Sequence, residues 1–211
     1  MTFVAASTSR RTQTERSSET RERLLDATVS SLVEVGYSRT STIEVSRRAG
    51  VSRGAQTHHY PTKAELVVAA VEHVFATQAD AFRAAFDALP DDRRTLDGAV
   101  EILWGIIGGP AYSAILELIV AARTDPELSA VVQGVAATFE QTVGTILGEL
   151  FPELAGTEFA SRILGFAFAL LQGAAVSESV GFFGPTADTV DLLRALASLP
   201  PRDLQVLLDL A

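Results

Sequence analysis

One short segment, residues 52–59, concentrates polar side chains of the types that read a nucleic acid. Its only apolar side chain is Ala55, so a helix over this segment would bury little and would present hydrogen-bonding groups outward. The guanidinium of Arg53 suits O6 and N7 of guanine together, and the methyl group of Thr57 suits the methyl group of thymine. A solvated surface helix in an ordinary bundle is the alternative interpretation of the same residues.

The elements that must position this segment follow from the signals around it. Ser41 and Glu44 have the spacing of a capping box, which predicts a short helix over residues 42–49. A turn at Gly50 separates this helix from the polar segment, so the two have helix-turn-helix spacing. The apolar side chains expected to hold the two helices together are Ile43, Val45 and Val51.

The chain as a whole is predicted to be all-α, because its 211 residues show neither strand alternation nor a repeat. Residues 1–19 are rich in Ser, Thr and Arg and indicate a flexible basic arm. We expect a three-helix domain over residues 20–66 and a larger helical domain over residues 67–211. Glycine and proline breaks delimit the predicted helices, which cover residues 20–36, 42–49, 52–59, 62–89, 94–107, 111–123, 126–150, 157–180, 187–198 and 202–210.

The two predicted domains differ in charge. Residues 1–66 contain ten Lys/Arg and seven Asp/Glu (+3), and residues 67–211 contain seven and nineteen (−12), which together give the net charge of −9. The basic N-terminal third favours an anionic partner. The absence of cysteine excludes disulfides and thiolate zinc sites. The longest apolar stretch, residues 163–176, is too short for a membrane span, so we expect a buried helix and a soluble, cytoplasmic protein.

Residues 20–70 resemble the N-terminal domain of the TetR family of bacterial transcriptional regulators. The resemblance rests on three stretches in order, TRERLLDATVSSLVEVGY, TSTIEVSRRAGVSRGA and HHYPTKAEL. It implies a homodimeric repressor that places its recognition helix, Ser52–His59, in the major groove of a palindromic double-stranded DNA operator. It also implies a C-terminal domain in which a small-molecule effector binds and thereby releases the DNA, without a cofactor.

The resemblance also assigns DNA contacts by position in these motifs. Thr42 and the amides that follow it are expected to meet phosphate at a helix N-terminus, and Lys63 to be a second phosphate ligand. Where the family usually has Leu-Tyr, this chain has Gln56 and Thr57. Gln56 would pair with adenine if it faced the groove, although the family's residue there tends to face inward. The expected DNA-contacting residues are Thr42, Ser52, Arg53, Gly54, Gln56, Thr57, His58, Tyr60 and Lys63.

The larger domain has residues suited to a ligand chamber and to pairing of two subunits. Aromatic and polar side chains on apolar helices predict the chamber, and core filling is the alternative. The expected chamber residues are Trp104, Tyr112, Glu117, Phe139, Phe168 and Gln172. Small and apolar residues in the last two helices predict dimerisation, with packing inside one subunit as the alternative. The expected interface residues are Ala160, Leu164, Leu171, Ala175, Leu192 and Leu196.

Catalysis and metal binding find little support in the sequence. His58 and His59 are adjacent, so on a helix they point about 100° apart and do not suit one metal ion. Neither a nucleophile elbow nor a glycine-rich phosphate loop occurs, so we expect no metal site and no enzyme. Two rival functions stay open: a helical small-molecule-binding protein with a degenerate DNA-binding motif, and a DNA-binding activator.

Overall fold

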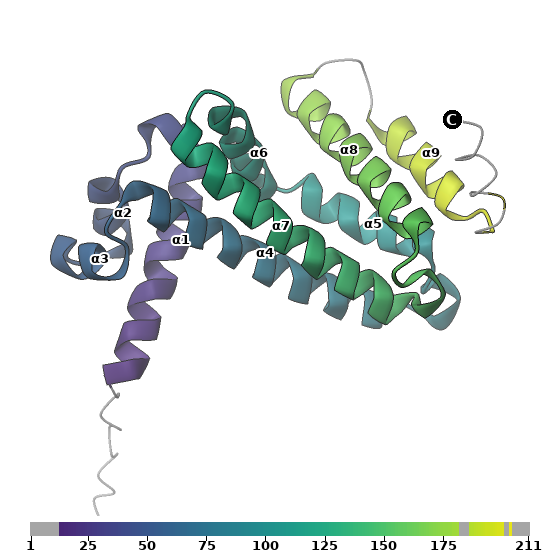
Figure 1. Cartoon of the computed structure of the whole chain (residues 1–211), viewed down its shortest axis with the longest axis horizontal. Helices are drawn as coiled ribbons and strands as arrows, with labels where there is room; N and C mark the ends of the chain where they lie inside the picture. Colours follow the sequence, from purple (N-terminus) through teal and green to yellow (C-terminus); the bar gives the residue numbers. More distant parts are fainter. Residues whose placement is uncertain (1–12, 182–185, 201–202, 204–211) are drawn as a thin grey trace, which may run out of the picture. The chain divides into compact units, whose positions relative to one another are not determined.

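The computed structural model describes residues 13–181, 186–200 and 203, and every regular element in that part of the chain is a helix (Figure 1). The expectation of an all-α fold is confirmed. The chain divides into two compact units, Met1–Ala70 and Val71–Ala211. The long helix α4, Lys63–Asp87, begins in the first unit and continues into the second.

The first unit contains α1 (Gln13–Arg39), α2 (Thr42–Ala49), α3 (Arg53–His59) and the beginning of α4. Its core gathers side chains from α1, α2 and α4, with half-buried residues from the turn and the end of α3 packed against them. The core residues are Leu24, Ala27, Val45, Ala49 and Leu66, with Val51 and Tyr60 packed against them. The Thr62 hydroxyl accepts a hydrogen bond from the amide of Glu65 (3.1 Å), which caps α4 as its capping-box spacing indicates.

The first helix differs from its predicted extent at both ends. It begins at Gln13 rather than at Thr20, so residues 13–19 are helical and not part of a flexible arm; residues 1–12 lie outside the described part of the chain. Gly36 breaks the helix but does not end it, since its backbone (φ 74°, ψ 172°) is followed by one more helical turn. A positive φ favours glycine here because it has no Cβ.

The second unit contains, after α4, a series of helices whose bounds lie within two residues of the predicted ones. They are α5 (Leu96–Ile107), α6 (Pro110–Ala122), α7 (Pro126–Leu150), α8 (Glu158–Val180) and α9 (Ala187–Ala197), with short 3-10 turns η1 (Asp91–Arg93) and η2 (Pro152–Leu154). The helix predicted over residues 202–210 falls almost wholly outside the described residues. Helix α5 packs on α9, α8 on α9, and α6 on α7 (Figure 1).

Helix α8 is apolar but little buried within its own chain. Its segment Ala160–Val180 is long and apolar enough to cross a membrane by length and composition (mean hydropathy 1.5), yet only 17% of the tested window is buried. Helices α5 and α6, bent by 73°, pass the same test as a pair. The expectation of a buried helix at residues 163–176 is therefore wrong, because most of this apolar surface is not covered by the described residues.

Candidate functional site

Helix α3 presents a polar face to solvent, as its composition predicts. The Ser52 hydroxyl accepts a hydrogen bond from the amide of Ala55 (3.2 Å) and so caps the helix. The exposed residues of this segment are Ser52, Arg53, Gly54, Thr57 and His58. The guanidinium of Arg53 makes no hydrogen bond or ion pair with any residue that the structure describes. These side chains are therefore available to a partner that supplies hydrogen-bonding edges.

Gln56 lies on the opposite face of α3, so its assignment to the DNA-contacting set is corrected. Its side chain is 2% exposed, and its amide nitrogen donates a hydrogen bond to the carbonyl oxygen of Tyr60 (2.6 Å). Pro61 follows Tyr60 and cannot continue the helix, so this carbonyl needs a side-chain donor. Gln56 thus stabilises the end of α3 from inside the unit.

Helix α2 supports α3 through one apolar face and a bound arginine. Val45 is fully buried, whereas Ile43 is 63% exposed, so the expectation that Ile43 helps to hold the helices together is wrong. The turn glycine, Gly50, has φ 61°, the left-handed conformation that suits a helix end. The guanidinium of Arg23 in α1 donates hydrogen bonds to the carbonyl oxygens of Ala49 and Gly50, which satisfies the end of α2.

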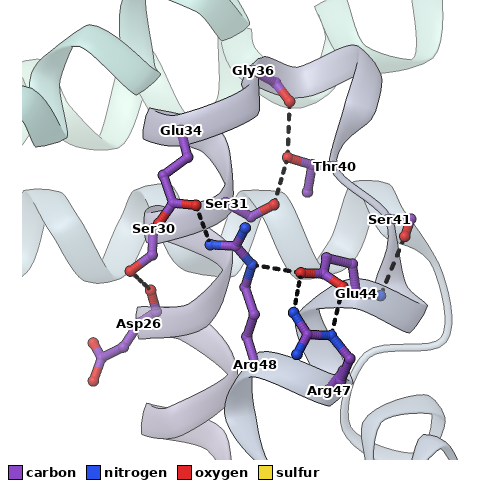
Figure 2. A network of polar contacts seen from close by, with 10 residues as sticks. All are labelled: Asp26, Ser30, Ser31, Glu34, Gly36, Thr40, Ser41, Glu44, Arg47 and Arg48. Carbon is purple, nitrogen blue, oxygen red and sulfur yellow. Dashed lines mark hydrogen bonds and ion pairs between the residues drawn. The ribbon is translucent and has the colours of Figure 1, made fainter.

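An ion-pair network fixes α2 against α1 (Figure 2). Arg48 bridges Glu34 of α1 (2.6 Å) and Glu44 of its own helix (2.9 Å). Arg47 makes two hydrogen bonds to the same Glu44 carboxylate, at 2.9 and 2.7 Å. Hydrogen bonds from Arg47 and then Arg48 lower the pKa of Glu44 to about 2. Glu44 therefore stays ionised at neutral pH and holds both guanidinium groups in place.

Hydroxyl groups complete the packing between α1 and α2. Thr40 donates its hydroxyl hydrogen to the carbonyl oxygen of Gly36 (2.8 Å), so Ser31 is the donor in the buried contact between the Ser31 and Thr40 hydroxyls (3.1 Å; Figure 2). At the N-terminus of α2, the Ser41 hydroxyl accepts from the amide of Glu44 (3.2 Å). Thr42, the first residue of that helix, is half-buried.

Lys63 stands at the start of α4 and contacts the end of α1. Its ammonium group donates to the carbonyl oxygen of Tyr37 (2.6 Å) and lies 4.0 Å from the centroid of the Tyr37 ring. Burial lowers the pKa of Lys63 from its ordinary value. An ammonium group has three N–H donors, so two stay available for an anion after the Tyr37 bond. Tyr60 is half-buried against the core of the unit.

The rings of the two adjacent histidines of α3, His58 and His59, lie edge-on to each other. Their ring centroids are 5.4 Å apart in an edge-on arrangement. Burial, followed by the nearby charges of His58 and Arg21, lowers the pKa of His59 from its ordinary value. Within the described residues, no group of three or more metal-ligating side chains comes together.

The second unit contains a partly open cavity of about 280 Å³. Residues of α4, α5, α6, α7, α8 and α9 line it, and nearly all of them are aliphatic or aromatic. Phe139 of α7 contacts Phe75 of α4 (4.5 Å between ring centroids) and Phe168 of α8 (5.1 Å, edge to face). The lining residues with polar groups are Gln78, Tyr112 and Thr142.

The expected chamber residues divide into lining and non-lining groups. Tyr112, Phe139 and Phe168 line the cavity. Gln172 lies behind it and hydrogen-bonds the Tyr112 hydroxyl. The assignment of Trp104 and Glu117 to the chamber is corrected. Glu117 is exposed on α6, and Trp104 is half-buried beside Gly108 at the end of α5. Sequence periodicity missed the contribution of the long helix α4, which supplies Phe75 and Phe82 to the lining.

Four of the six expected interface residues face inward, so their assignment to the interface is corrected. Ala160 and Leu171 are buried in their own unit (4% and 0% exposed), and Leu164 and Leu196 line the cavity. Ala175 is half-buried, and only Leu192 is exposed, at 61%. The exposed stripe of α8, which the sequence did not distinguish from its buried face, consists of Phe166, Ala169, Gly173, Val176 and Val180. Phe166 is exposed and also borders the cavity.

Comparison with known proteins places these features in a family. Residues 24–70 match the family described as bacterial regulatory proteins, tetR family. The HTH-type transcriptional regulator CymR of Pseudomonas putida is 37% identical over 175 residues, which cover 79% of this chain and 83% of CymR. An uncharacterised HTH-type regulator of Mycobacterium tuberculosis is 37% identical over 133 residues, 63% of this chain and 68% of that protein. A transcriptional regulator of Saccharomonospora viridis, solved in complex with choline, has a TM-score of 0.62 at 18% identity and covers 85% of this chain and 95% of its own.

Proposed function

Because the chain belongs to the TetR family of bacterial transcriptional regulators, we propose that it is a homodimeric repressor that binds a palindromic operator and leaves it when a small molecule occupies the cavity. The observation that carries this proposal is the exposed polar face of α3. Gln56, on the buried side of the helix, stabilises its C-terminal end through the hydrogen bond to the carbonyl oxygen of Tyr60. A helix of this kind fits the major groove, where base edges offer donors and acceptors.

The proposed DNA contacts divide into base readers and phosphate ligands. Arg53, Gly54, Thr57 and His58, all exposed on α3, are the base readers. The backbone phosphates are contacted by four groups. These are the N-terminus of α2 at Thr42, the ammonium of Lys63, and Ser52 and Tyr60 at the two ends of α3. Phosphate contacts set the register of the protein on the duplex, whereas base contacts select the sequence.

The proposed dimer interface is the exposed stripe of α8 together with Leu192 of α9. Its residues recur at intervals of three and four, so they share one face of the helix. Val180 is 70% exposed and Phe166 is 47% exposed, and exposed apolar residues that share one face of a helix are typical of an interaction surface. Pairing of the same stripe from two copies around a twofold axis would remove this surface from water.

The proposed effector site is the cavity of the second unit. Proteins of this fold accommodate small molecules, as the choline complex of the Saccharomonospora viridis regulator illustrates. The cavity fits this role because it is mostly apolar and has few polar groups. A ligand releases DNA only to the extent that it binds the non-operator form of the dimer more tightly than the operator-bound form. The function is regulatory and not catalytic, and we place it in the cytoplasm with the operator DNA.

Selection of bound duplexes from a random library, with the full chain, tests the proposal. A twofold-symmetric consensus bound by two subunits, with affinity that falls steeply as salt rises, supports it. Absence of enrichment would favour the rival small-molecule-binding protein with a degenerate DNA-binding motif. In vitro transcription from a promoter that overlaps the selected operator then decides the sign: lower output with the protein supports a repressor, and higher output an activator.

A further inference from the structure

The cavity of the second unit is selective in its chemistry because its described lining holds no charged side chain. The ion pairs of this unit form between residues outside the cavity lining. Arg93 and Arg194 both bind Glu101 (2.8 and 3.1 Å), and Arg83 binds Glu149 (3.0 Å). A charged ligand in the cavity would lose hydration without gaining a counter-charge, so its binding is disfavoured.

Of the three polar residues in the described lining, Tyr112 is best suited to receive a buried ligand atom. The hydroxyl of Thr142 donates its hydrogen to the carbonyl oxygen of Thr138 in its own helix (2.9 Å). Gln78 is half-exposed, so water competes for its amide. Tyr112 is 6% exposed and lies on α6 with its hydroxyl bonded to Gln172 of α8.

Tyr112 keeps its phenol protonated at neutral pH. Burial raises the pKa of Tyr112 to about 12, and the hydrogen bond with Gln172 acts in the opposite direction, toward a lower pKa. The phenol oxygen has lone pairs that can accept from an amide such as that of Gln172. The phenol stays protonated at neutral pH, and its O–H remains available to donate to a ligand.

The remaining walls set the size and shape of the ligand. At about 30 Å³ for each water-sized group, a cavity of about 280 Å³ holds roughly ten such groups. Phe75, Phe139 and Phe168 form a continuous aromatic wall, and ring-to-ring contacts favour an aromatic ligand at edge or offset geometry.

We propose that the effector of this cavity is an uncharged, mainly apolar molecule of roughly ten to twelve non-hydrogen atoms that carries an aromatic ring and a single hydrogen-bond acceptor received by the Tyr112 hydroxyl. This inference rests on the proposed function in one respect, that the cavity is an effector site. It adds the chemical class of the effector and the residue that recognises its polar atom.

Four compounds with a phenyl ring and a four-carbon chain separate these features: butyrophenone (neutral acceptor), butylbenzene (no acceptor), 4-phenylbutyrate (negative) and 4-phenylbutylammonium (positive). Their binding to the full chain is measured by calorimetry in the absence of DNA. Butyrophenone is expected to bind best, butylbenzene about tenfold more weakly, and each charged compound at least about 100-fold more weakly.

Two tyrosine variants assign the recognition to one hydroxyl. Tyr112→Phe is expected to weaken butyrophenone about tenfold and to leave butylbenzene unchanged. Tyr37→Phe removes a hydroxyl in the other unit and is expected to change neither affinity. Thermal melts of both variants establish that they fold. A charged compound that binds as well as butyrophenone, equal loss of both neutral compounds in Tyr112→Phe, or no binding by any of the four overturns the inference.

Operator release is measured separately, by fluorescence anisotropy of the selected duplex. If butyrophenone binds the wild type but does not release DNA, the proposed chemical class of the ligand stands and the effector role under the proposed function is contradicted. Release by a charged compound and not by butyrophenone supports the effector role and overturns the chemical class. The two failures are therefore distinguishable.

Discussion

Gln56 and Arg53 lie within one turn of α3, yet the structure gives them opposite surroundings. The Gln56 amide is buried and donates to the carbonyl oxygen of Tyr60 (2.6 Å), whereas Arg53 is exposed. We therefore expect Gln56→Ala to affect folding of α3 and Arg53→Ala to affect base reading. The two substitutions serve as controls for each other because both shorten a side chain on the same helix to a methyl group.

The magnitude for Gln56→Ala follows from two losses. The hydrogen bond contributes about 1–2 kcal/mol, because its donor is buried but the carbonyl of Tyr60 is only half-buried. Removal of the side chain beyond Cβ leaves a void that costs a further 1–2 kcal/mol or so. The sum, about 2–4 kcal/mol, corresponds to at least a 30-fold or so rise in the equilibrium constant for opening. Arg53→Ala should change stability by less than about 0.5 kcal/mol, because it is an exposed position.

Amide hydrogen exchange of the peptide that covers α3 measures the first effect. Exchange is preferable to fluorescence because Trp104, the only tryptophan, lies in the second unit. Titration of operator and random duplexes measures the second effect. Arg53→Ala should cost about 1–3 kcal/mol on the operator and relax the preference at one base pair. Gln56→Ala should keep the ratio of operator to random affinity.

The opposite pattern would refute the assignment of Gln56. If Gln56→Ala left exchange of α3 unchanged and removed discrimination at one base pair, its side chain would face the DNA, and burial in the free protein would be a poor guide to the bound state. If Arg53→Ala weakened operator and random duplex equally, Arg53 would be a phosphate ligand and not a base reader.

Four further substitutions test the structure that supports α3 and the proposed dimer interface. Gly50→Ala should destabilise the first unit by about 1–2 kcal/mol because the backbone φ of Gly50 is 61°. Gly54→Ala should stabilise α3 slightly, because no atom lies within 4 Å of the added methyl group. Equal shifts of the urea midpoint in the two variants would contradict this reasoning. Leu192→Asp should convert dimer to monomer in sedimentation velocity without a change in helical content, and a persistent dimer would remove α9 from the interface. The pKa of Glu44 is lowered to about 2 in the folded protein, so its carboxylate stabilises the folded state above about pH 4.5, and this contribution is lost as the pH falls toward 2. The melting temperatures of wild type and Glu44→Gln should therefore converge on acidification over that range. A constant difference between them would refute this reasoning.

Helix bounds were predictable from the sequence because the signals that set them are local. The hydroxyls of Ser41, Ser52 and Thr62 each accept an amide hydrogen bond within three residues, as their spacing indicates. The extension of α1 to Gln13 was not predictable, because residues 13–19 lack apolar periodicity, and an exposed helical turn leaves no such pattern.

The direction of individual side chains was less predictable, since apolar residues look alike whatever covers them. Leu171 and Val180 lie on one helix, but the first is fully buried and the second is 70% exposed. Hydropathy does not distinguish a face that packs inside the unit from one that stays exposed on its surface. The same holds for Ile43 and Val45 of α2, only two residues apart, of which the structure buries only Val45.

Polar contacts complete α3, because its own apolar burial is small. Ala55 is its only apolar side chain, so the Ser52 cap and the bond from Gln56 to the carbonyl oxygen of Tyr60 stabilise the helix within its own segment. Val51 and Tyr60 flank α3 and pack against the core, which orients the helix in the unit next to the end of α2 that Arg23 holds. Apart from Ser52, none of these groups lies on the exposed face of α3. Substitutions of Arg53, Thr57 or His58 should therefore change which DNA sequence is bound while the fold is preserved.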